Sequence, residues 1–220
     1  MYKRQPSFNT DLLHVTHGRS AAFATGLKLA VPKMKVIVCA GDGDTSAIGG
    51  NHLIHAARRN IDLTLICVNN QIFGMTGGQV APSTPYDSKT TTTPYGSIER
   101  PFDLSSLAIA AGATFVARWT TYQVRPLKNS IKKAIMHKGF SFIEVVSQCP
   151  VQYGKVISKR NNAVSMLLDY KKYSVNISKA RSMSEEKLKD KIIVGELVEK
   201  KNIPELTDEI KRLRKEAARK

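Results

Sequence analysis

Hydrophobic residues between positions 11 and 150 follow two alternating patterns. Short apolar runs rich in β-branched residues predict buried strands at 35–40, 62–68, 114–118 and 141–146. The stretches around them are helix-compatible and predict helices at 20–30, 49–59, 102–111 and 126–137. Strands separated by helices at this spacing predict an α/β fold, with a parallel sheet that carries helices on both faces. Ligands of such sheets bind beyond the carboxyl ends of the strands.

Two segments depart from this rhythm. Residues 70–98 are rich in Gly, Pro and Thr and predict a long loop, which in a compact domain usually has a function. After Gly154 the chain becomes rich in Lys, Asn and Ser, and a helix is predicted over 204–220. We therefore expect a domain over residues 1–154, followed by a basic C-terminal tail or docking segment over residues 155–220.

The composition is that of a globular protein. The 220 residues are 42% hydrophobic and 24% charged. No run approaches the roughly 18 apolar residues that span a bilayer, and no apolar segment follows the basic start, so we expect neither a membrane segment nor a secretory signal. The three cysteines lie far apart, which argues against a disulfide framework and fits a reducing cytoplasm.

The formal net charge of +16 raises the question of nucleic-acid binding. Residues 1–154 and 155–220 each carry a net charge of +8, so the shorter C-terminal segment has the higher charge density. No aromatic and basic platform accompanies the charge, which disfavours nucleic acid as a partner. The remaining interpretations are a solvated helical face and attraction of an acidic partner protein.

Polar residues follow two of the predicted strands directly. Gly41-Asp42-Gly43-Asp44 comes directly after the first strand, and Asn69-Asn70 comes directly after the second. If the two strands are neighbours, an Asp carboxylate and an Asn amide oxygen can bind one Mg²⁺ ion, and glycine lets the backbone approach a diphosphate. The helix from about Gly49 can point its positive end at the same anion. The alternative is an ordinary polar turn between strand and helix.

This spacing resembles the thiamine-diphosphate motif, and several further motifs sharpen the resemblance. Together they are similar to the beta subunit of 2-oxoacid:ferredoxin oxidoreductases, most nearly the 2-oxoglutarate type, over about residues 8–155. The motifs are His17–Arg19, Gly41–Asp44, Ile48–His52, Ala56–Asn60, Asn69–Gln79 and Cys149–Pro150. The resemblance implies a thiamine-diphosphate-binding fold with a parallel sheet.

The resemblance also implies roles for the residues at the two strand ends. Asp42 and the side chain of Asn70 would ligate Mg²⁺, with the backbone carbonyl of Ile72 as a third protein ligand. Gly43 and Asp44 would contact the diphosphate of the cofactor.

Four more residues acquire roles by the same resemblance. Gly74 and Met75 would contact the cofactor beyond the metal, and His17 would be a catalytic group that hydrogen-bonds near the cofactor. Cys149 would be one thiolate ligand of a [4Fe–4S] cluster. By contrast, Cys39 and Cys67 lie within apolar strands and are expected to be packed core thiols, and His52 and His55, which lack a third ligand, are expected to be structural.

The chain departs from the family at its beginning. Family members open with about fifty further residues that contain Cys-Pro-x-Cys, whereas no Cys-x-x-Cys occurs here. A [4Fe–4S] cluster usually takes four thiolates, and this sequence offers one candidate. We therefore expect an N-terminally truncated sequence, with the cluster bound by the intact parent.

The resemblance implies oxidative decarboxylation of 2-oxoglutarate with coenzyme A, giving succinyl-CoA, CO₂ and reduced ferredoxin. The resemblance also implies an acidic residue that hydrogen-bonds the aminopyrimidine ring of the cofactor. The two glutamates that precede residue 155, Glu99 and Glu144, lie in no recognisable pyrimidine-binding context. An alpha subunit would therefore complete the thiamine site at an interface that includes loop 70–98. Alternatives are pyruvate or another 2-oxoacid as substrate, a non-oxidative thiamine-diphosphate enzyme, and a non-enzymatic basic binding module.

Overall fold

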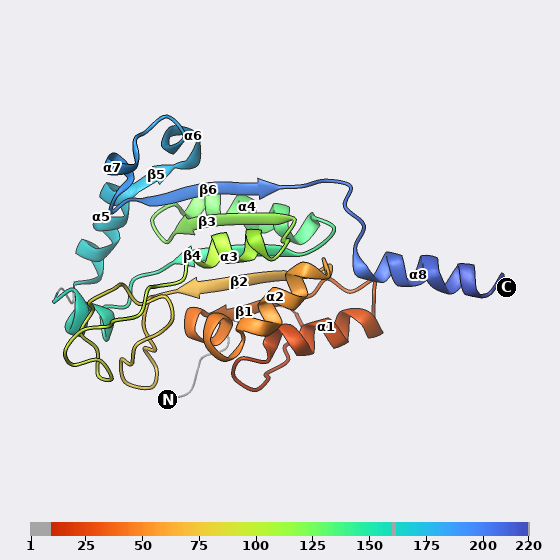
Figure 1. Ribbon diagram of the computed structural model, residues 1–220, viewed down its shortest axis with the longest axis horizontal. Coiled ribbons are helices and arrows are strands. Elements are labelled where there is room, and N and C mark those ends of the chain that lie inside the picture. The colour runs from red at the N-terminus through yellow and green to blue at the C-terminus, as the bar shows by residue number, and fades with distance from the viewer. Residues whose placement is uncertain (1–9, 160–161, 220) are drawn as a thin grey trace.

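The computed structural model describes residues 10–159 and 162–219. In this part of the chain six strands form one sheet in the order β1–β2–β4–β3–β6–β5 (Figure 1). The strands are β1 (Ile37–Gly41), β2 (Thr64–Asn69), β3 (Phe115–Thr120), β4 (Ser141–Val146), β5 (Ser174–Asn176) and β6 (Ile192–Glu199). The α-helices are α1 (Ser20–Ala30), α2 (Gly50–Arg58), α3 (Leu104–Ala110), α4 (Val124–Met136), α5 (Ala163–Tyr173), α6 (Ile177–Ala180), α7 (Glu185–Leu188) and α8 (Leu206–Ala217). Two π-helical turns are η1 (Asp44–Ile48) and η2 (Tyr153–Ile157).

The first four strands run parallel and are connected through helices. β1 pairs with β2, β2 with β4, and β4 with β3, all in parallel register. The predicted α/β order is therefore confirmed, with boundaries that differ from the predicted ones by no more than about two residues. It could be predicted because each strand is a short, apolar, β-branched run bounded by polar residues.

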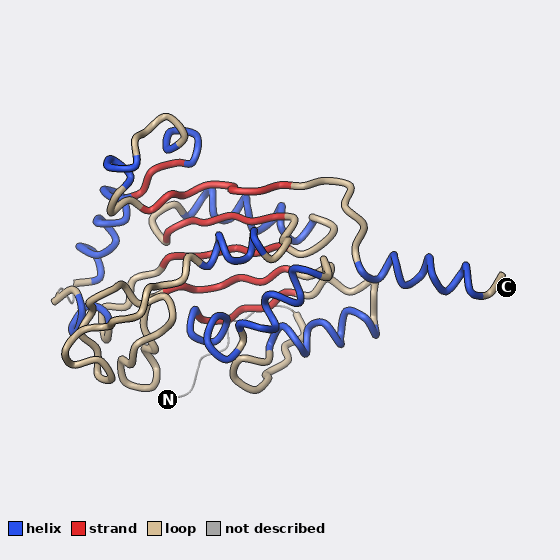
Figure 2. The backbone as a smooth tube through the Cα atoms, viewed as in Figure 1, coloured by secondary structure: helices blue, strands red, loops and turns tan. Residues whose placement is uncertain are grey.

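Two hydrophobic clusters lie on opposite faces of the sheet, whose strands are drawn in red in Figure 2. Alternation along β3 directs Val116 into the cluster that includes α1, α2 and α3, and directs Phe115 into the cluster that includes α4. Phe142 and Ile143 on β4 divide in the same way. Helices on both faces were predicted, and this arrangement confirms them.

The segment after residue 154 contributes to the sheet, beyond its expected role as a basic tail. β6 pairs antiparallel with β3, with a bulge at Val116/Ala117, and β5 pairs parallel with β6. The sheet is therefore mixed at this edge. Asn60 then fixes the approach to α8, because its Nδ2 donates to the carbonyl of Pro204 at 2.9 Å. From there α8 extends away from the body of the molecule (Figure 1).

One strip of the sheet, on β1 and the adjoining end of β2, is exposed. Ile37 is 46% exposed and Val68 is 40% exposed, and Cys39 between them is exposed as well. The expectation that Cys39 is a packed core thiol was therefore wrong: α4 packs on β3 and β4, and no described residue buries this strip. Cys67 lies in the hydrophobic cluster that includes α1, α2 and α3 and is fully buried, as expected.

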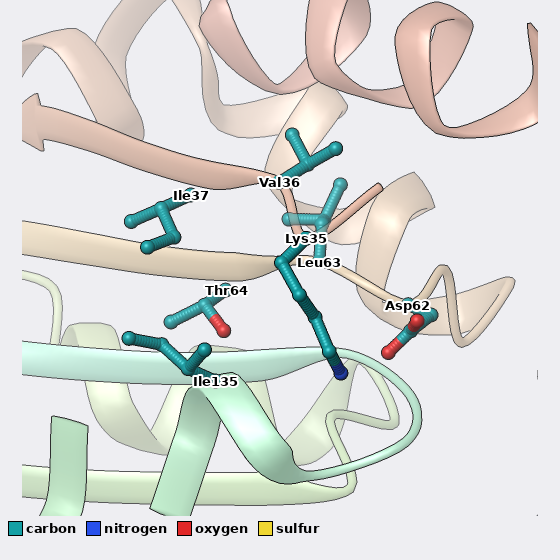
Figure 3. A pocket seen from close by; sticks show the side chains of 7 residues that line it. All are labelled: Lys35, Val36, Ile37, Asp62, Leu63, Thr64 and Ile135. Carbon is teal, nitrogen blue, oxygen red and sulfur yellow. The ribbon is translucent and has the colours of Figure 1, made fainter. Parts of the chain in front are cut away.

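A small cavity lies at the amino ends of β1 and β2. Figure 3 shows its lining, which is Lys35, Val36, Ile37, Asp62, Leu63, Thr64 and Ile135. Its volume is about 10 Å³, which is room for about one water molecule. It is therefore too small for a substrate, and it lies at the end of the sheet opposite to the polar strand ends.

Candidate functional site

The carboxyl ends of β1 and β2 bring the predicted metal-binding segments together. Gly41 pairs with Val68 in the parallel register, so Asp42 and Asn69 leave the sheet side by side. Asp42 is 3% exposed. The hydroxyl of Ser83 donates to its Oδ2, and the backbone amide of Gln71 also interacts with its carboxylate. The expected convergence of the two strand ends is thus present.

Asp42 is a buried carboxylate that lacks a cationic partner within residues 10–159 and 162–219. Burial raises the pKa of the Asp42 carboxyl, and hydrogen bonds from Ser83 and from the amides of Gly43 and Gln71 offset part of that rise. No Lys, Arg or His of the described chain forms an ion pair with it. A bound divalent cation would supply the missing positive charge, so the residues present fit Mg²⁺ at this position.

The turn after β2 holds the other two predicted metal ligands. The Oδ1 of Asn69 accepts from the amide of Gln71 at 3.1 Å, and the Oδ1 of Asn70 accepts from the amide of Ile72 at 3.2 Å. Gln71 between them has a φ of +62°, a left-handed conformation that is uncommon outside glycine. These two side-chain-to-backbone turns fix the place of Asn70 and of the buried Ile72, whose ligand roles stay predictions.

Gly43 packs closely against the aromatic ring of Phe73. A Cβ at this position would meet the Phe73 Cε1 at 2.1 Å, so only glycine permits this packing. The helical turn η1 begins directly after Gly43. The helix terminus at the strand end is therefore that of η1, earlier than the predicted start near Gly49, and π-helical turns of this kind are frequent at functional sites.

Asp44 and His17 form a pair beside Gly43. The Nδ1 of His17 lies 2.7 Å from the Oδ1 of Asp44, which also accepts from the amide of Gly18 at 2.5 Å. The ring of His17 lies 6.3 Å from that of Phe73. The structure thus brings His17 to the same strand end, where Asp44 orients it. The predicted diphosphate contact of Asp44 would then fall to its backbone rather than to its carboxylate.

Gly74 lies between the predicted metal-binding turn and Cys149. A Cβ at Gly74 would lie 3.5 Å from the Sγ of Cys149 and 3.7 Å from the Nδ2 of Asn70. The thiol also accepts from the amide of Gln152 at 3.5 Å. Met75, next along the loop, is 60% exposed and free to contact a ligand. The structure therefore gathers these predicted positions around one loop.

Cys149 is the cysteine next to Gly74, whereas Cys67 on β2, which is also near Asp42 and Asp44, is fully buried in the core. In the described part of the chain, no group of three or more His, Cys, Asp or Glu side chains could hold a metal ion. The predicted magnesium site, with one carboxylate, one amide and one carbonyl, is of a different kind. The cluster role of Cys149 stays a prediction that requires further thiolates.

Ser83 and Thr84 are site residues that sequence reasoning missed. Ser83 contacts Asp42, and the hydroxyl of Thr84 donates to the carbonyl of Gln71 at 2.7 Å. Both are buried although they lie in a segment predicted only as a long loop. Their position between two prolines, Pro82 and Pro85, signals a turn but does not indicate what it packs against.

The outer part of the same loop is ordered by its own threonines and exposes apolar side chains. Thr90 and Thr93 share a hydrogen bond of 2.7 Å, and the amide of Val80 donates to Thr92 at 3.0 Å. Tyr95 is 94% exposed and Ile98 is 87% exposed. A partner chain that covered this loop would bury both side chains.

The fold and the site define the class of protein. The family model of the thiamine pyrophosphate enzymes, C-terminal TPP binding domain, matches residues 1–145 of this chain. The chain belongs to this family.

The relatives narrow the class. A protein of Methanocaldococcus jannaschii named 2-oxoglutarate synthase subunit KorB is 58% identical over 203 residues, which are 92% of this chain and 74% of that protein. The protein of the same name from Methanothermobacter marburgensis is 55% identical over 200 residues, 91% of this chain and 70% of that one. Among thiamine pyrophosphate enzymes, the chain is thus a KorB-type beta subunit of a 2-oxoacid:ferredoxin oxidoreductase.

A solved structure supports the same assignment. The 2-oxoglutarate:ferredoxin oxidoreductase from Magnetococcus marinus, with 2-oxoglutarate, coenzyme A and succinyl-CoA bound, is 30% identical and has a TM-score of 0.80. The match covers 92% of this chain and 69% of that chain. Separately, no helix within the described residues is long and apolar enough to cross a membrane.

Proposed function

We propose that this chain binds thiamine diphosphate through Mg²⁺ in an enzyme that acts on 2-oxoglutarate. The reaction converts 2-oxoglutarate, coenzyme A and oxidised ferredoxin into succinyl-CoA, CO₂ and reduced ferredoxin. The observation that carries the proposal is the buried Asp42 carboxylate at the joined ends of β1 and β2, which lacks a cationic partner in the described chain. The names of the relatives support the choice of substrate.

Each residue of the site has a part that follows from its position. Asp42, the Asn70 amide oxygen and the Ile72 carbonyl would hold the metal, while Gly43 and the backbone of Asp44 would face the diphosphate. Bound thiamine diphosphate supplies the electron sink that makes loss of CO₂ from a 2-oxoacid possible.

The other side chains orient and enclose the cofactor. His17, held by Asp44, offers its Nε2 to the site as a hydrogen-bonding group. Gly74 allows close approach of a ligand to the backbone, and Met75 would pack against the cofactor. Cys149, next to Gly74, would provide one thiolate of a [4Fe–4S] cluster that passes electrons to ferredoxin.

A partner chain would complete the site. A thiamine enzyme requires a carboxylate at the pyrimidine ring of the cofactor, and neither glutamate of residues 10–159 is placed for this role. Glu144 is buried and paired with Arg118, and Glu99 is exposed to solvent on the loop. We infer that an alpha subunit supplies this carboxylate and docks on the outer part of loop 70–98, where Tyr95 and Ile98 are exposed. The basic charge suits an acidic ferredoxin, and the free cysteines support the cytoplasm as the compartment.

The experiment reconstitutes the chain with its alpha subunit, Mg²⁺ and thiamine diphosphate and follows reduction of ferredoxin or a viologen dye. We expect reduction that requires both coenzyme A and 2-oxoglutarate, with pyruvate and a branched-chain 2-oxoacid much slower. CO₂ release without dye reduction would indicate a non-oxidative enzyme instead. Salt-sensitive nucleic-acid binding without thiamine affinity would indicate a basic binding module.

A further inference from the structure

A buried polar network connects the metal-binding turn to the centre of the sheet. Its hub is Glu144 on β4, which is 3% exposed. Its Oε1 accepts from the Nδ2 of Asn69 at 2.8 Å, and its Oε2 accepts from the Nε of Arg118 at 2.8 Å and from the hydroxyl of Ser105 at 2.5 Å. Three donors from three different elements thus meet at one carboxylate.

The network ends at the start of α3 on one side and at the turn around Gln71 on the other. The second arm of Arg118 contacts Asp103, which accepts from the amide of Ser106 and so caps the start of α3. On the opposite side, Asn69 uses its remaining side-chain oxygen to hold the amide of Gln71. Among the described residues, Asn69 is therefore the one that connects Glu144 to the turn by hydrogen bonds.

The turn needs this support because its backbone is unusual. Gln71 has a φ of +62°, which costs free energy for a residue other than glycine. Its amide is held by Asn69 and its carbonyl by Thr84. The amide of Gln71 also interacts with the carboxylate of Asp42, so a shift of Gln71 would alter both sides of the site.

Stability alone does not account for a charge at position 144. A buried ion pair often adds little to folding compared with well-packed apolar residues, because both charges must be desolvated. Groups that contact metal ligands, by contrast, orient them, and their loss weakens metal binding by about 10- to 100-fold. The network has this second arrangement, because Asn69 holds the amide of Gln71, which also interacts with the carboxylate of the proposed ligand Asp42.

We propose that Glu144 is a positioning residue for the metal site: through Asn69 it fixes the turn that carries Asn70 and Ile72. The inference rests on the proposed function, because it assumes that this turn binds Mg²⁺ and thiamine diphosphate. Glu144 itself touches neither group.

The test measures binding of Mn²⁺ in the presence of thiamine diphosphate to the full chain with its partner subunit, by electron paramagnetic resonance. Glu144→Gln keeps the size of the side chain, and while its remaining oxygen accepts from Arg118, its NH₂ group faces the donor Nδ2 of Asn69 and breaks that hydrogen bond. We expect its Mn²⁺ affinity to fall about 10- to 100-fold. Glu196→Gln is the matched control, because Glu196 on β6 also accepts from a serine and a cation, Ser130 and Lys133, and does not contact Asn69. Its affinity should equal that of the wild type.

A second pair of variants separates positioning from general weakening of the fold. Asn69→Asp retains the acceptor for Gln71 but faces the Glu144 carboxylate with a like charge, so its affinity should also fall. In the double variant Asn69→Asp/Glu144→Gln, the new amide can donate to the new carboxylate. We expect affinity to recover at least tenfold relative to either single variant, whereas two independent defects would add.

Asn69→Ala covers the case in which Glu144→Gln does not fold, since it leaves Glu144 with Arg118 and Ser105. Its affinity should fall as well. Unchanged affinity in Glu144→Gln or in Asn69→Ala, while Asp42→Asn abolishes binding, would overturn the positioning role alone. Wild-type protein that binds no Mn²⁺ would overturn the proposed function, and the positioning role with it.

Discussion

The second glycine of the Gly41-Asp42-Gly43 motif gives a prediction whose sign depends on one contact. Gly43 has helical backbone angles, φ −65° and ψ −35°, where alanine is normally favoured over glycine by about 0.5–1 kcal/mol. A Cβ at this position would lie 2.1, 2.5 and 2.7 Å from three ring carbons of Phe73. The ring must retreat by more than 1 Å, and overpacking of this kind costs about 1–3 kcal/mol. The clash outweighs the propensity, so Gly43→Ala should destabilise the protein.

Urea unfolding followed by circular dichroism measures this effect. We expect Gly43→Ala to lower the free energy of unfolding by about 1–2 kcal/mol with an unchanged slope. Gly41→Ala is the matched control, since no described residue beyond its chain neighbours lies within 4 Å of a Cβ there, and it should change stability by less than about 0.5 kcal/mol.

Removing the ring should reverse the sign. In a Phe73→Ala background, Gly43→Ala loses its clash and should be neutral or stabilising by up to about 1 kcal/mol. Two results would refute the packing of the Phe73 ring on the strand end. One is a Gly43→Ala variant as stable as the wild type, and the other is an equal loss of stability from Gly43→Ala with Phe73 and with Ala at position 73.

Three further predictions concern groups away from the site. Lys28→Met should lower the free energy of unfolding by about 3 kcal/mol in urea titrations, because Lys28 is 1% exposed and its Nζ lies 2.6 Å from the Oδ2 of Asp62, whose charge is left unpaired. Adding Asp62→Asn removes that charge and should restore part of the lost stability. Asn60→Ala should cost about 2–3 kcal/mol in the same assay, since it leaves the buried amide of Phe140 unpaired. Burial lowers the pKa of His137, so the folded state binds this proton less readily than the unfolded chain does. Stability should therefore fall as pH drops from about 6.5 towards the lowered pKa, and the loss of melting temperature between pH 7.5 and 5.5 should be smaller in His137→Gln. Equal losses in both proteins would contradict the assignment.

The helices and parallel strands of the first 150 residues could be predicted because burial on both faces leaves a clear signal. The run 141–146 is apolar at four of its six positions, and the strand in the structure has the same bounds. β6 was not predicted, because Glu196 and Glu199 interrupt its apolar residues and Gly195 lies in its middle with a φ of +140°. A strand at the antiparallel edge carries a weaker pattern than a central parallel one.

The site was predicted in part. Asp42 and Asn70 could be placed at one edge because both follow buried strands, and parallel strands end together. The contact of Ser83 with Asp42 could not be predicted, since it depends on how a loop of some thirty residues folds back. The exposure of Cys39 likewise depends on which strip of the sheet the helices leave uncovered, and an apolar run gives no information on that.

The measurement that tests the central claim most directly is calorimetric titration of thiamine diphosphate into the chain with its partner subunit, with and without Mg²⁺, in wild type and Asp42→Asn. The substitution keeps the shape of the side chain and removes its charge. We predict saturable binding that requires Mg²⁺ in the wild type and is abolished in Asp42→Asn, with both proteins folded. Binding that is independent of Mg²⁺, or equal in the two proteins, would contradict a metal held at the joined ends of β1 and β2.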